Sequence, residues 1–178
     1  MDQRTVDYYE QNALAVVAGT EILDTATARQ YSRKRFCAYL EAGASVLDLG
    51  CGSGRDSKYF AEMGYRVRAI DISPTMAVQA TKICGFAVEV MDFAELESEG
   101  EFDGVWASAS LIHCSREDLE VDVLPRIKRA MKQGGVLYVY LKEGEGVKRD
   151  EKGRLLQVLQ EARFEGGLQG VGVFGVVA

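Results

Sequence analysis

The sequence predicts an α/β protein built on a doubly wound, mostly parallel sheet with helices on both faces. Short apolar runs alternate with segments of helical apolar spacing, and the alternation repeats four times along the chain. Polar residues directly follow the expected strands, namely Asp71, Asp92, the 108–113 segment and Lys142. Since ligands of such sheets sit beyond the carboxyl ends of the strands, we expect these residues around one site.

Residues 1–42 are expected to form an N-terminal helical cap. No proline interrupts residues 9–40, and apolar residues recur at roughly helical spacing through Phe36 and Leu40. Gly43 is expected to close this helical segment.

Residues 43–142 are expected to form the core of the sheet. The expected strands are short apolar runs at 45–49, 66–70, 86–90, 102–107 and 136–141. The expected helices between them are 55–63, 74–83 and 117–131. Pro74 suits a first helical turn, whereas Pro125 predicts a break inside its helix, and Gly134 with Gly135 predicts a turn.

Residues 143–178 predict a shortened end to the sheet within one domain spanning residues 1–178. A helix is expected over 153–164, followed by a sixth strand over 171–177 that its glycines weaken. A missing closing hairpin would expose a sheet edge, so we expect a homodimer through that edge or reduced stability.

Composition narrows the classes of function. The chain has 178 residues, is 47% hydrophobic and 27% charged, and carries a formal net charge of -6. This acidity disfavours nucleic acid as a partner. The basic cluster Arg29, Arg33, Lys34 and Arg35 is a possible local patch, and a solvated helix face is its simpler interpretation. No apolar run is long enough to cross a bilayer, and the polar 1–10 segment is unlike a signal peptide.

Cysteine usage predicts a reduced, cytoplasmic chain without a bound metal. The four cysteines are Cys37, Cys51, Cys84 and Cys114, and no two stand in a C-x-x-C pair. Cys51 lies between two glycines and is expected to be a small filler rather than a nucleophile.

The strongest chemical signal is the glycine-rich segment VLDLGCGSG, which begins at Val46. An apolar strand runs into Gly50, Gly52 and Gly54 and then into a helix. Glycines permit a sharp bend and a close approach of ligand to backbone, and the helix N-terminus presents N–H groups to an anion. A dinucleotide fingerprint would need a glycine where Arg55 stands. A glycine-rich turn without a ligand is the alternative.

The Asp-x-Gly-x-Gly-x-Gly pattern from Asp48 to Gly54 resembles the first motif of class I S-adenosylmethionine-dependent methyltransferases, which have a Rossmann-like fold. The segments 55–57, 91–93, 110–113 and 134–138 resemble a bacterial branch of small-molecule methyltransferases that includes the tellurite-resistance-type enzymes. The resemblance covers roughly residues 9–154. It implies transfer of a methyl group from S-adenosyl-L-methionine to a small acceptor by in-line displacement.

The resemblance also implies which residues contact the cofactor. They lie mainly at strand ends and are Tyr9, Asp48, Gly50, Gly52, Gly54, Arg55, Asp71, Ile72, Met76, Asp92, Phe93 and Ser108. Asp71 is expected to accept hydrogen bonds from the ribose hydroxyls, as a carboxylate does at this place in related sheets. Asp92 is expected to contact the adenine amino group, and Ser108 to accept the methionine ammonium through its backbone carbonyl. Helix capping by Asp92 and core packing by Phe93 are the alternatives.

Candidates for the acceptor side are Asn12, His113 and Lys142. Tyr9 and Asn12 resemble the opening Tyr-x-x-Asn-Ala segment of the branch, although both also suit the surface of an amphipathic helix. His113, the only histidine, is a candidate general base or orienting group, or else a packed polar residue. Lys142 is a candidate for attracting an anionic substrate, with a solvated loop charge as the alternative.

Two other functions stay open at this point. An NAD-dependent oxidoreductase has a similar sheet, but Arg55 replaces its third glycine and no Tyr-x-x-x-Lys pair follows. A non-catalytic protein that binds adenosylmethionine or a partner would suit the shortened C-terminal segment.

Overall fold

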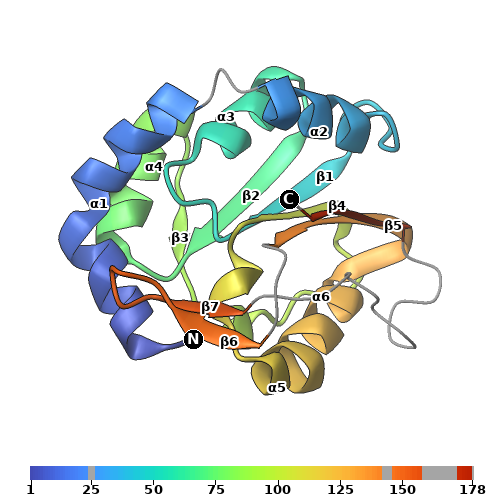
Figure 1. The fold of residues 1–178 in the computed structure, drawn as a ribbon. Helices are drawn as coiled ribbons and strands as arrows, with labels where there is room; N and C mark the ends of the chain where they lie inside the picture. Colours follow the sequence, from blue (N-terminus) through green and yellow to red (C-terminus); the bar gives the residue numbers. More distant parts are fainter. Residues whose placement is uncertain (24–26, 142–145, 158–171, 178) are drawn as a thin grey trace.

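The computed structural model describes residues 1–23, 27–141, 146–157 and 172–177, and its centre is a six-stranded sheet (Figure 1). The strands run in the order β3 (Glu89–Val90), β2 (Arg66–Asp71), β1 (Ser45–Leu49), β4 (Phe102–Ser108), β5 (Met131–Leu141) and β8 (Gly172–Val177). Every neighbouring pair is parallel. The strand order reverses between β1 and β4, which is where sheets of this kind open a crevice for ligands.

Helices cover both faces of this sheet, as the sequence predicts (Figure 1). They are α1 (Gln3–Leu23), α2 (Thr27–Cys37), α3 (Arg55–Glu62), α4 (Pro74–Cys84), α5 (Arg116–Asp118) and α6 (Leu124–Ala130). Shorter helical turns are η1 (Phe93–Glu95), η2 (Leu111–His113) and the π-type segment η3 (Leu119–Val123). No helix in the described part of the chain is both long enough and apolar enough to span a membrane.

Alternate residues of the central strands point to two separate cores. Val46 and Trp106 face one side, where they pack with Phe36 of α2 and Phe60 of α3. Their neighbours along the strands, with Leu47 among them, face the other side and pack with η1, η3 and α6. This alternation on strands buried on both faces explains why the strands appear in the sequence as continuous apolar runs.

Several expected elements have different bounds in the structure. The helical segment over 9–40 is two helices, α1 and α2, and α1 begins at Gln3. Only Glu89 and Val90 of the expected third strand pair with β2. Pro125 lies in the first turn of α6, so the break or kink predicted at this proline takes the form of a π-type segment directly before it, without an end to the helical backbone.

The predicted turn at Gly134 and Gly135 is wrong, since both residues lie within β5. The strand absorbs them through a register shift opposite the 102–104 part of β4. Gly134 takes a left-handed φ of 78° there, so the glycine bends the strand without ending it.

The predicted helix over 153–164 is also wrong where the structure describes it. Leu155–Gln157 forms strand β7, which pairs antiparallel with β6 (Val147–Arg149). Gly153, with a φ of 77°, sits in the turn between them, and a left-handed glycine interrupts a helix. Residues 158–164 lie outside the described residues.

The sixth strand predicted near the C-terminus is confirmed as β8, which pairs with β5 along Val136–Leu141. Among the described strands, β8 is the outermost on this side of the sheet.

Candidate active site

The glycine-rich turn after β1 adopts a conformation that only glycine takes readily. Gly50, Gly52 and Gly54 have φ values of 75°, 57° and 76°. A Cβ on Gly50 would lie 2.5 Å from Cβ of Ser110, and one on Gly54 would lie 2.9 Å from Cβ of Ala80. A Cβ on Gly52 would meet only Cε of Met76, at 3.9 Å. Gly50 and Gly54 thus allow close packing, whereas Gly52 leaves open space in front of the turn.

Asp71, at the end of β2, is bound directly to this turn. Its Oδ2 accepts a hydrogen bond from the Gly52 N–H at 2.9 Å, and its Oδ1 accepts one from the Ser73 N–H at 3.0 Å. Burial raises the pKa of this carboxyl to about 6, against the two backbone hydrogen bonds that favour its charged form. The carboxylate holds the turn in place and keeps lone pairs for a ligand hydroxyl.

Two further carboxylates lie beneath the turn. Asp48 is buried and accepts a hydrogen bond from the Ser57 hydroxyl. Burial and then the nearby charge of Asp56 raise the pKa of Asp48 well above its usual range. Asp56 in turn accepts hydrogen bonds from Arg29, Arg33 and the Trp106 indole. This network joins α2 and α3 to β4 behind the site.

A cavity opens at the carboxyl ends of β1, β2 and β4, where the turn, α1 and the end of β4 meet. Most predicted site residues line it: Tyr9, Asp48, Gly50, Gly52, Arg55, Asp71, Ile72, Met76, Phe93, Ser108 and His113. It is also lined by residues that the sequence did not single out for the site: Met1, Val16, Thr20, Cys51, Ser53, Asp56, Ala109 and Ser110. The first motif and the strand ends thus meet around one cavity, as predicted.

Three predicted residues lie away from the cavity wall. Gly54 packs on Ala80, and Asn12 donates a hydrogen bond to the Tyr8 carbonyl. Asp92 accepts hydrogen bonds from the Ala94 N–H, as the cap of η1, and from the amino group of Met1. The proposed alternative of capping is therefore the contact that Asp92 makes in this structure. Lys142 lies outside the described residues.

The loop after β4 places a hydroxyl group without a hydrogen-bond partner in the wall of the cavity. Among the described residues, Ser110 Oγ is the buried side-chain oxygen without a hydrogen-bond partner. Its neighbour Ala109 has a φ of 59°, which costs a non-glycine residue about 1–3 kcal/mol. A strained backbone beside an unpartnered hydroxyl indicates a ligand-binding loop, although nothing in the sequence marks Ala109.

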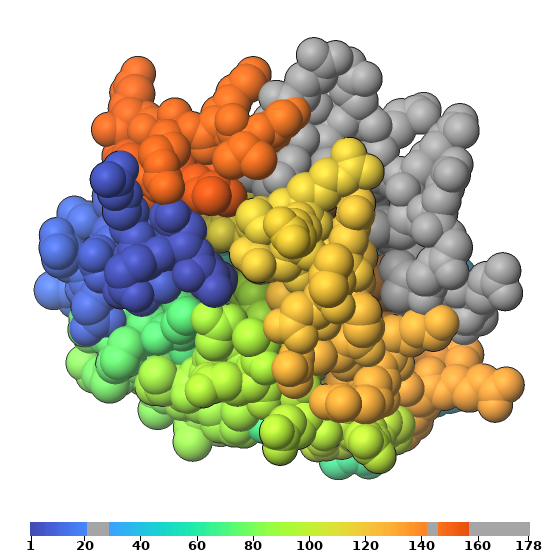
Figure 2. Space-filling view, turned by 90° about the horizontal axis from the view of Figure 1, so that it is seen from below, coloured from blue at the N-terminus to red at the C-terminus, as the bar shows by residue number. Residues whose placement is uncertain are grey.

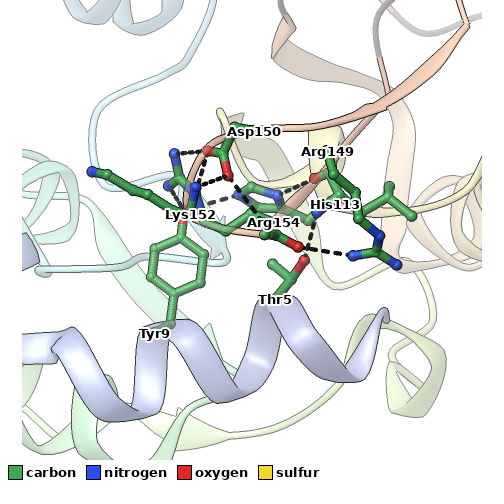
Figure 3. Close-up of polar contacts among 9 residues, drawn as sticks. Thr5, Tyr9, His113, Arg149, Asp150, Lys152 and Arg154 are labelled. Carbon is green, nitrogen blue, oxygen red and sulfur yellow. Dashed lines mark hydrogen bonds and ion pairs between the residues drawn. The ribbon is translucent and has the colours of Figure 1, made fainter.

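His113 lines the cavity and is held by both ring nitrogens (Figure 3). Its Nδ1 lies 2.8 Å from the Leu155 carbonyl oxygen, and its Nε2 lies 2.9 Å from the Tyr9 hydroxyl. A carbonyl only accepts, so Nδ1 carries the proton and Nε2 accepts from Tyr9. Burial, the largest cause, lowers the pKa of His113, which favours this neutral form.

The β6–β7 hairpin covers this end of the site. Figure 2 shows the hairpin (orange), the start of α1 (blue) and the 111–123 region (yellow) meeting on one face. Leu155 N–H donates to Thr5 Oγ1 at 2.9 Å, and Arg149 pairs with Asp2 at 2.7 Å. The hairpin is the part of the site that sequence reasoning missed, because its contacts to α1 are remote along the chain.

The fold and the cavity define a class: a nucleotide-binding α/β protein with its ligand crevice at the reversal of strand order. The comparisons with known proteins narrow that class. A family model described as a methyltransferase domain matches residues 46–135, which include the glycine-rich turn, Asp71 and His113. The chain belongs to the class I S-adenosylmethionine-dependent methyltransferases.

Individual proteins similar to this chain are also methyltransferases. Malonyl-[acyl-carrier protein] O-methyltransferase of Salmonella typhimurium is 33% identical over 137 residues, which are 75% of this chain and 49% of that protein. The chain therefore spans about half the length of this curated relative.

Two solved structures share the fold. One is the Burkholderia thailandensis 1,6-didemethyltoxoflavin-N1-methyltransferase with bound 1,6-didemethyltoxoflavin and S-adenosylhomocysteine. It is 25% identical, with a TM-score of 0.69 over 87% of this chain and 72% of that chain. The other is a TehB-like methyltransferase from Corynebacterium glutamicum, 25% identical, with a TM-score of 0.57 over 75% of this chain and 71% of that one.

Proposed function

We propose that this protein transfers the methyl group of S-adenosyl-L-methionine to a small-molecule acceptor. One observation carries the proposal: the Gly52 N–H and the Asp71 carboxylate are hydrogen-bonded to each other in the wall of a cavity at the reversal of strand order. This arrangement offers a backbone cradle and a buried carboxylate side by side. The named acceptors of relatives, malonyl-acyl carrier protein and 1,6-didemethyltoxoflavin, support a metabolite as the acceptor.

The residues of the cavity suit the parts of adenosylmethionine. Gly52 leaves room for the amino-acid end to approach the turn, and Asp71 would accept hydrogen bonds from the ribose hydroxyls. Met76 and Phe93 offer apolar surface to the adenine ring, and the carbonyl of Ser108 would accept from the ammonium. The unpartnered Ser110 hydroxyl fits a polar ligand at the same wall.

Bound adenosylmethionine supplies a methyl group on a positively charged sulfur, and the protein supplies position and electrostatics. Holding the acceptor in line with that methyl group is worth on the order of 7–11 kcal/mol at best. Tyr9, His113 and Ser110 line the same cavity and are the side chains we propose for the acceptor side. His113, neutral and with Nε2 as an acceptor, is the residue we propose to bind or deprotonate the acceptor.

Three further proposals concern the chain as a whole. We propose a single domain over residues 1–178 in the cytoplasm, and Lys142 as an acceptor-side residue. We also propose that association of two copies would use an outer edge of the sheet, where a strand offers unpaired backbone groups.

Calorimetry with adenosylmethionine and with NAD tests the function. We expect binding of adenosylmethionine alone, and Gly52→Leu should remove it because the new side chain fills the space before the turn. The matched control is Gly43→Leu, at a glycine with a similar φ of 73° and nothing within 4 Å. Binding of NAD in place of adenosylmethionine, or full affinity in Gly52→Leu, would contradict the proposal. Cofactor binding without methyl transfer to any of a broad panel of metabolites would favour the non-catalytic alternative.

A further inference from the structure

Tyr9 belongs to a series of hydrogen bonds that joins three segments distant in the sequence, namely α1, η2 and the β6–β7 hairpin. Its hydroxyl lies 2.9 Å from Nε2 of His113 and 2.8 Å from Nη1 of Arg154 (Figure 3). Arg154 can only donate, so Tyr9 accepts from Arg154 and donates to His113. The series ends at the Leu155 carbonyl, which accepts from Nδ1 of His113 at 2.8 Å.

We propose that Tyr9 and His113 form a proton relay for the methyl acceptor, with Arg154 as the positioning residue that holds the Tyr9 hydroxyl. This inference rests on the proposed methyl transfer and names a class of acceptor for it. The acceptor carries a proton on its reacting atom, as a phenol, an enol or an N–H group does. An acceptor that is already an anion needs no such relay.

The relay balances in protons and in charge. The acceptor passes its proton to the Tyr9 oxygen while the Tyr9 proton moves to Nε2 of His113. The freed electron pair of the acceptor forms the bond to the methyl carbon, and the methyl–sulfur bond breaks with its electron pair on sulfur. The positive charge thus leaves the sulfonium and is found on the His113 imidazolium, which later releases a proton to water.

The surroundings of the two rings suit this transfer. Tyr9 and His113 both line the cavity, and their rings lie edge to face with centroids 5.4 Å apart. The charged groups that act electrostatically on His113 are Arg154, Asp150 and Asp2. Those that act on Tyr9 are Arg154 and Asp71, and the titratable hydroxyl of Tyr8 also lies close to it. Burial raises the pKa of Tyr9, and Arg154 offsets part of this by stabilising negative charge on the Tyr9 oxygen during the transfer. Burial lowers the pKa of His113, so its Nε2 carries no proton before the transfer.

Arg154 is itself fixed firmly enough to place Tyr9. Its Nε donates to Oδ2 of Asp150 at 2.8 Å, and its guanidinium lies 5.1 Å from the centre of the Tyr8 ring. A guanidinium held on one side by a carboxylate and on the other by an aromatic face keeps a fixed direction. The hairpin thus contributes chemistry to the site as well as cover.

The single histidine makes the relay directly measurable by NMR of ¹⁵N-labelled protein loaded with S-adenosylhomocysteine. We expect the imidazole proton on Nδ1. Arg154→Leu should raise the pKa of His113, and Arg154→Lys should restore it because the charge returns. Arg149→Leu is the matched control, since Arg149 binds Asp2 and the Gly153 carbonyl of the same hairpin.

The second readout uses 4-nitrophenol, a proton-bearing probe whose ionised form absorbs visible light. Added to the loaded protein, it should bind in part as the nitrophenolate, with the proton on His113. Tyr9→Phe and His113→Gln should each lower the ionised bound fraction at least tenfold, and Arg149→Leu should leave it within twofold.

Three results would overturn the relay: a proton on Nε2, imidazole signals that nitrophenol leaves unchanged, or an Arg149→Leu variant that reproduces Arg154→Leu. Calorimetry with S-adenosylhomocysteine separates the two proposals. If the unsubstituted protein binds S-adenosylhomocysteine but its His113 signals do not respond to nitrophenol, the relay alone is rejected. If the unsubstituted protein does not bind S-adenosylhomocysteine, the proposed function is rejected as well.

Discussion

The two halves of the site are built in different ways. The half proposed for the cofactor, from Asp48 to Met76, comes from one continuous strand–turn–helix–strand–helix segment of the chain and is called the cofactor half. The half proposed for the acceptor, called the acceptor half, joins Tyr9 of α1, His113 of η2 and Arg154 of the β6–β7 hairpin. The first half depends on local backbone geometry, and the second depends on tertiary contacts between remote segments. Substitutions should therefore act differently in the two halves.

The largest effect is expected at Gly50, where local geometry and packing coincide. Gly50 and Gly43 have φ values of 75° and 73°, but only a Cβ on Gly50 would meet a neighbour, Cβ of Ser110 at 2.5 Å. We expect Gly43→Ala to cost about 1 kcal/mol for its left-handed backbone. Gly50→Ala should cost about 3 kcal/mol or more, because overpacking is added to the same strain.

Urea unfolding of the two variants measures this difference in the free energy of unfolding. Equal losses in Gly43→Ala and Gly50→Ala would show that the turn and the loop after β4 are not packed as described.

The next largest effect is expected at Asp71. Asp71→Asn keeps the size of the side chain but removes the charge that accepts from the Gly52 and Ser73 N–H groups and, as proposed, from the ribose. We expect the affinity for adenosylmethionine to fall about 100-fold, since a hydrogen bond to a charged group contributes about 1.5–3 kcal/mol. Calorimetry measures it, with Glu89→Gln as the control on the adjacent, exposed β3. A Glu89→Gln variant that loses as much affinity would remove the basis for the ribose role.

The difference between the halves also explains what the sequence could predict. The strand ends and the turn are set by short-range patterns, so VLDLGCGSG and Asp71 predicted the fold class and the cofactor half. Gly134 shows the limit of such patterns, because a glycine can either end a strand or bend it. Here the pairing of β5 with β4 determines that the strand continues through Gly134. Asp92 shows another limit, because one carboxylate suits both a cap and a ligand contact.

The acceptor half could be predicted only in part. His113 and Tyr9 were candidates by position, but their contact with each other spans 104 residues and has no local signature. Arg154 lay in a segment whose spacing favoured a helix. The hairpin forms instead because Leu155 finds partners on Thr5 and His113, and such tertiary hydrogen bonds outweigh weak helix propensity.

An intermediate effect is expected from pH, and it acts in opposite directions on stability and on binding. Burial raises the pKa of Asp71 to about 6, from 3.8 in a model carboxyl. Between these values the folded state holds a proton that the unfolded state has released, so stability falls as pH rises from about 4 to about 6. Binding of the ribose needs the ionised form, so affinity should fall about tenfold per pH unit below pH 6.

Calorimetry and urea unfolding between about pH 4 and about pH 8 follow the two quantities. In Asp71→Asn, the free energy of unfolding and the affinity should both vary less with pH, because the titrating carboxyl group is gone. An affinity that stays constant below pH 6 in the unchanged protein would mean that the ionised carboxylate does not bind the ligand.

The smallest effect is expected in the acceptor half, at Thr5. Its buried hydroxyl accepts from the Leu155 N–H and donates to Asp2. Thr5→Val should cost about 1–2 kcal/mol for the lost hydrogen bonds and should speed hydrogen exchange at the Leu155 amide. Affinity for adenosylmethionine should change less than twofold, because the cofactor half makes none of these contacts. Ser115→Ala, which removes the cap of α5, is the control of similar cost away from the hairpin. If Thr5→Val instead weakened cofactor binding as much as Asp71→Asn does, the two halves would be one cooperative unit, and the hairpin would have to be counted among the parts that hold the cofactor.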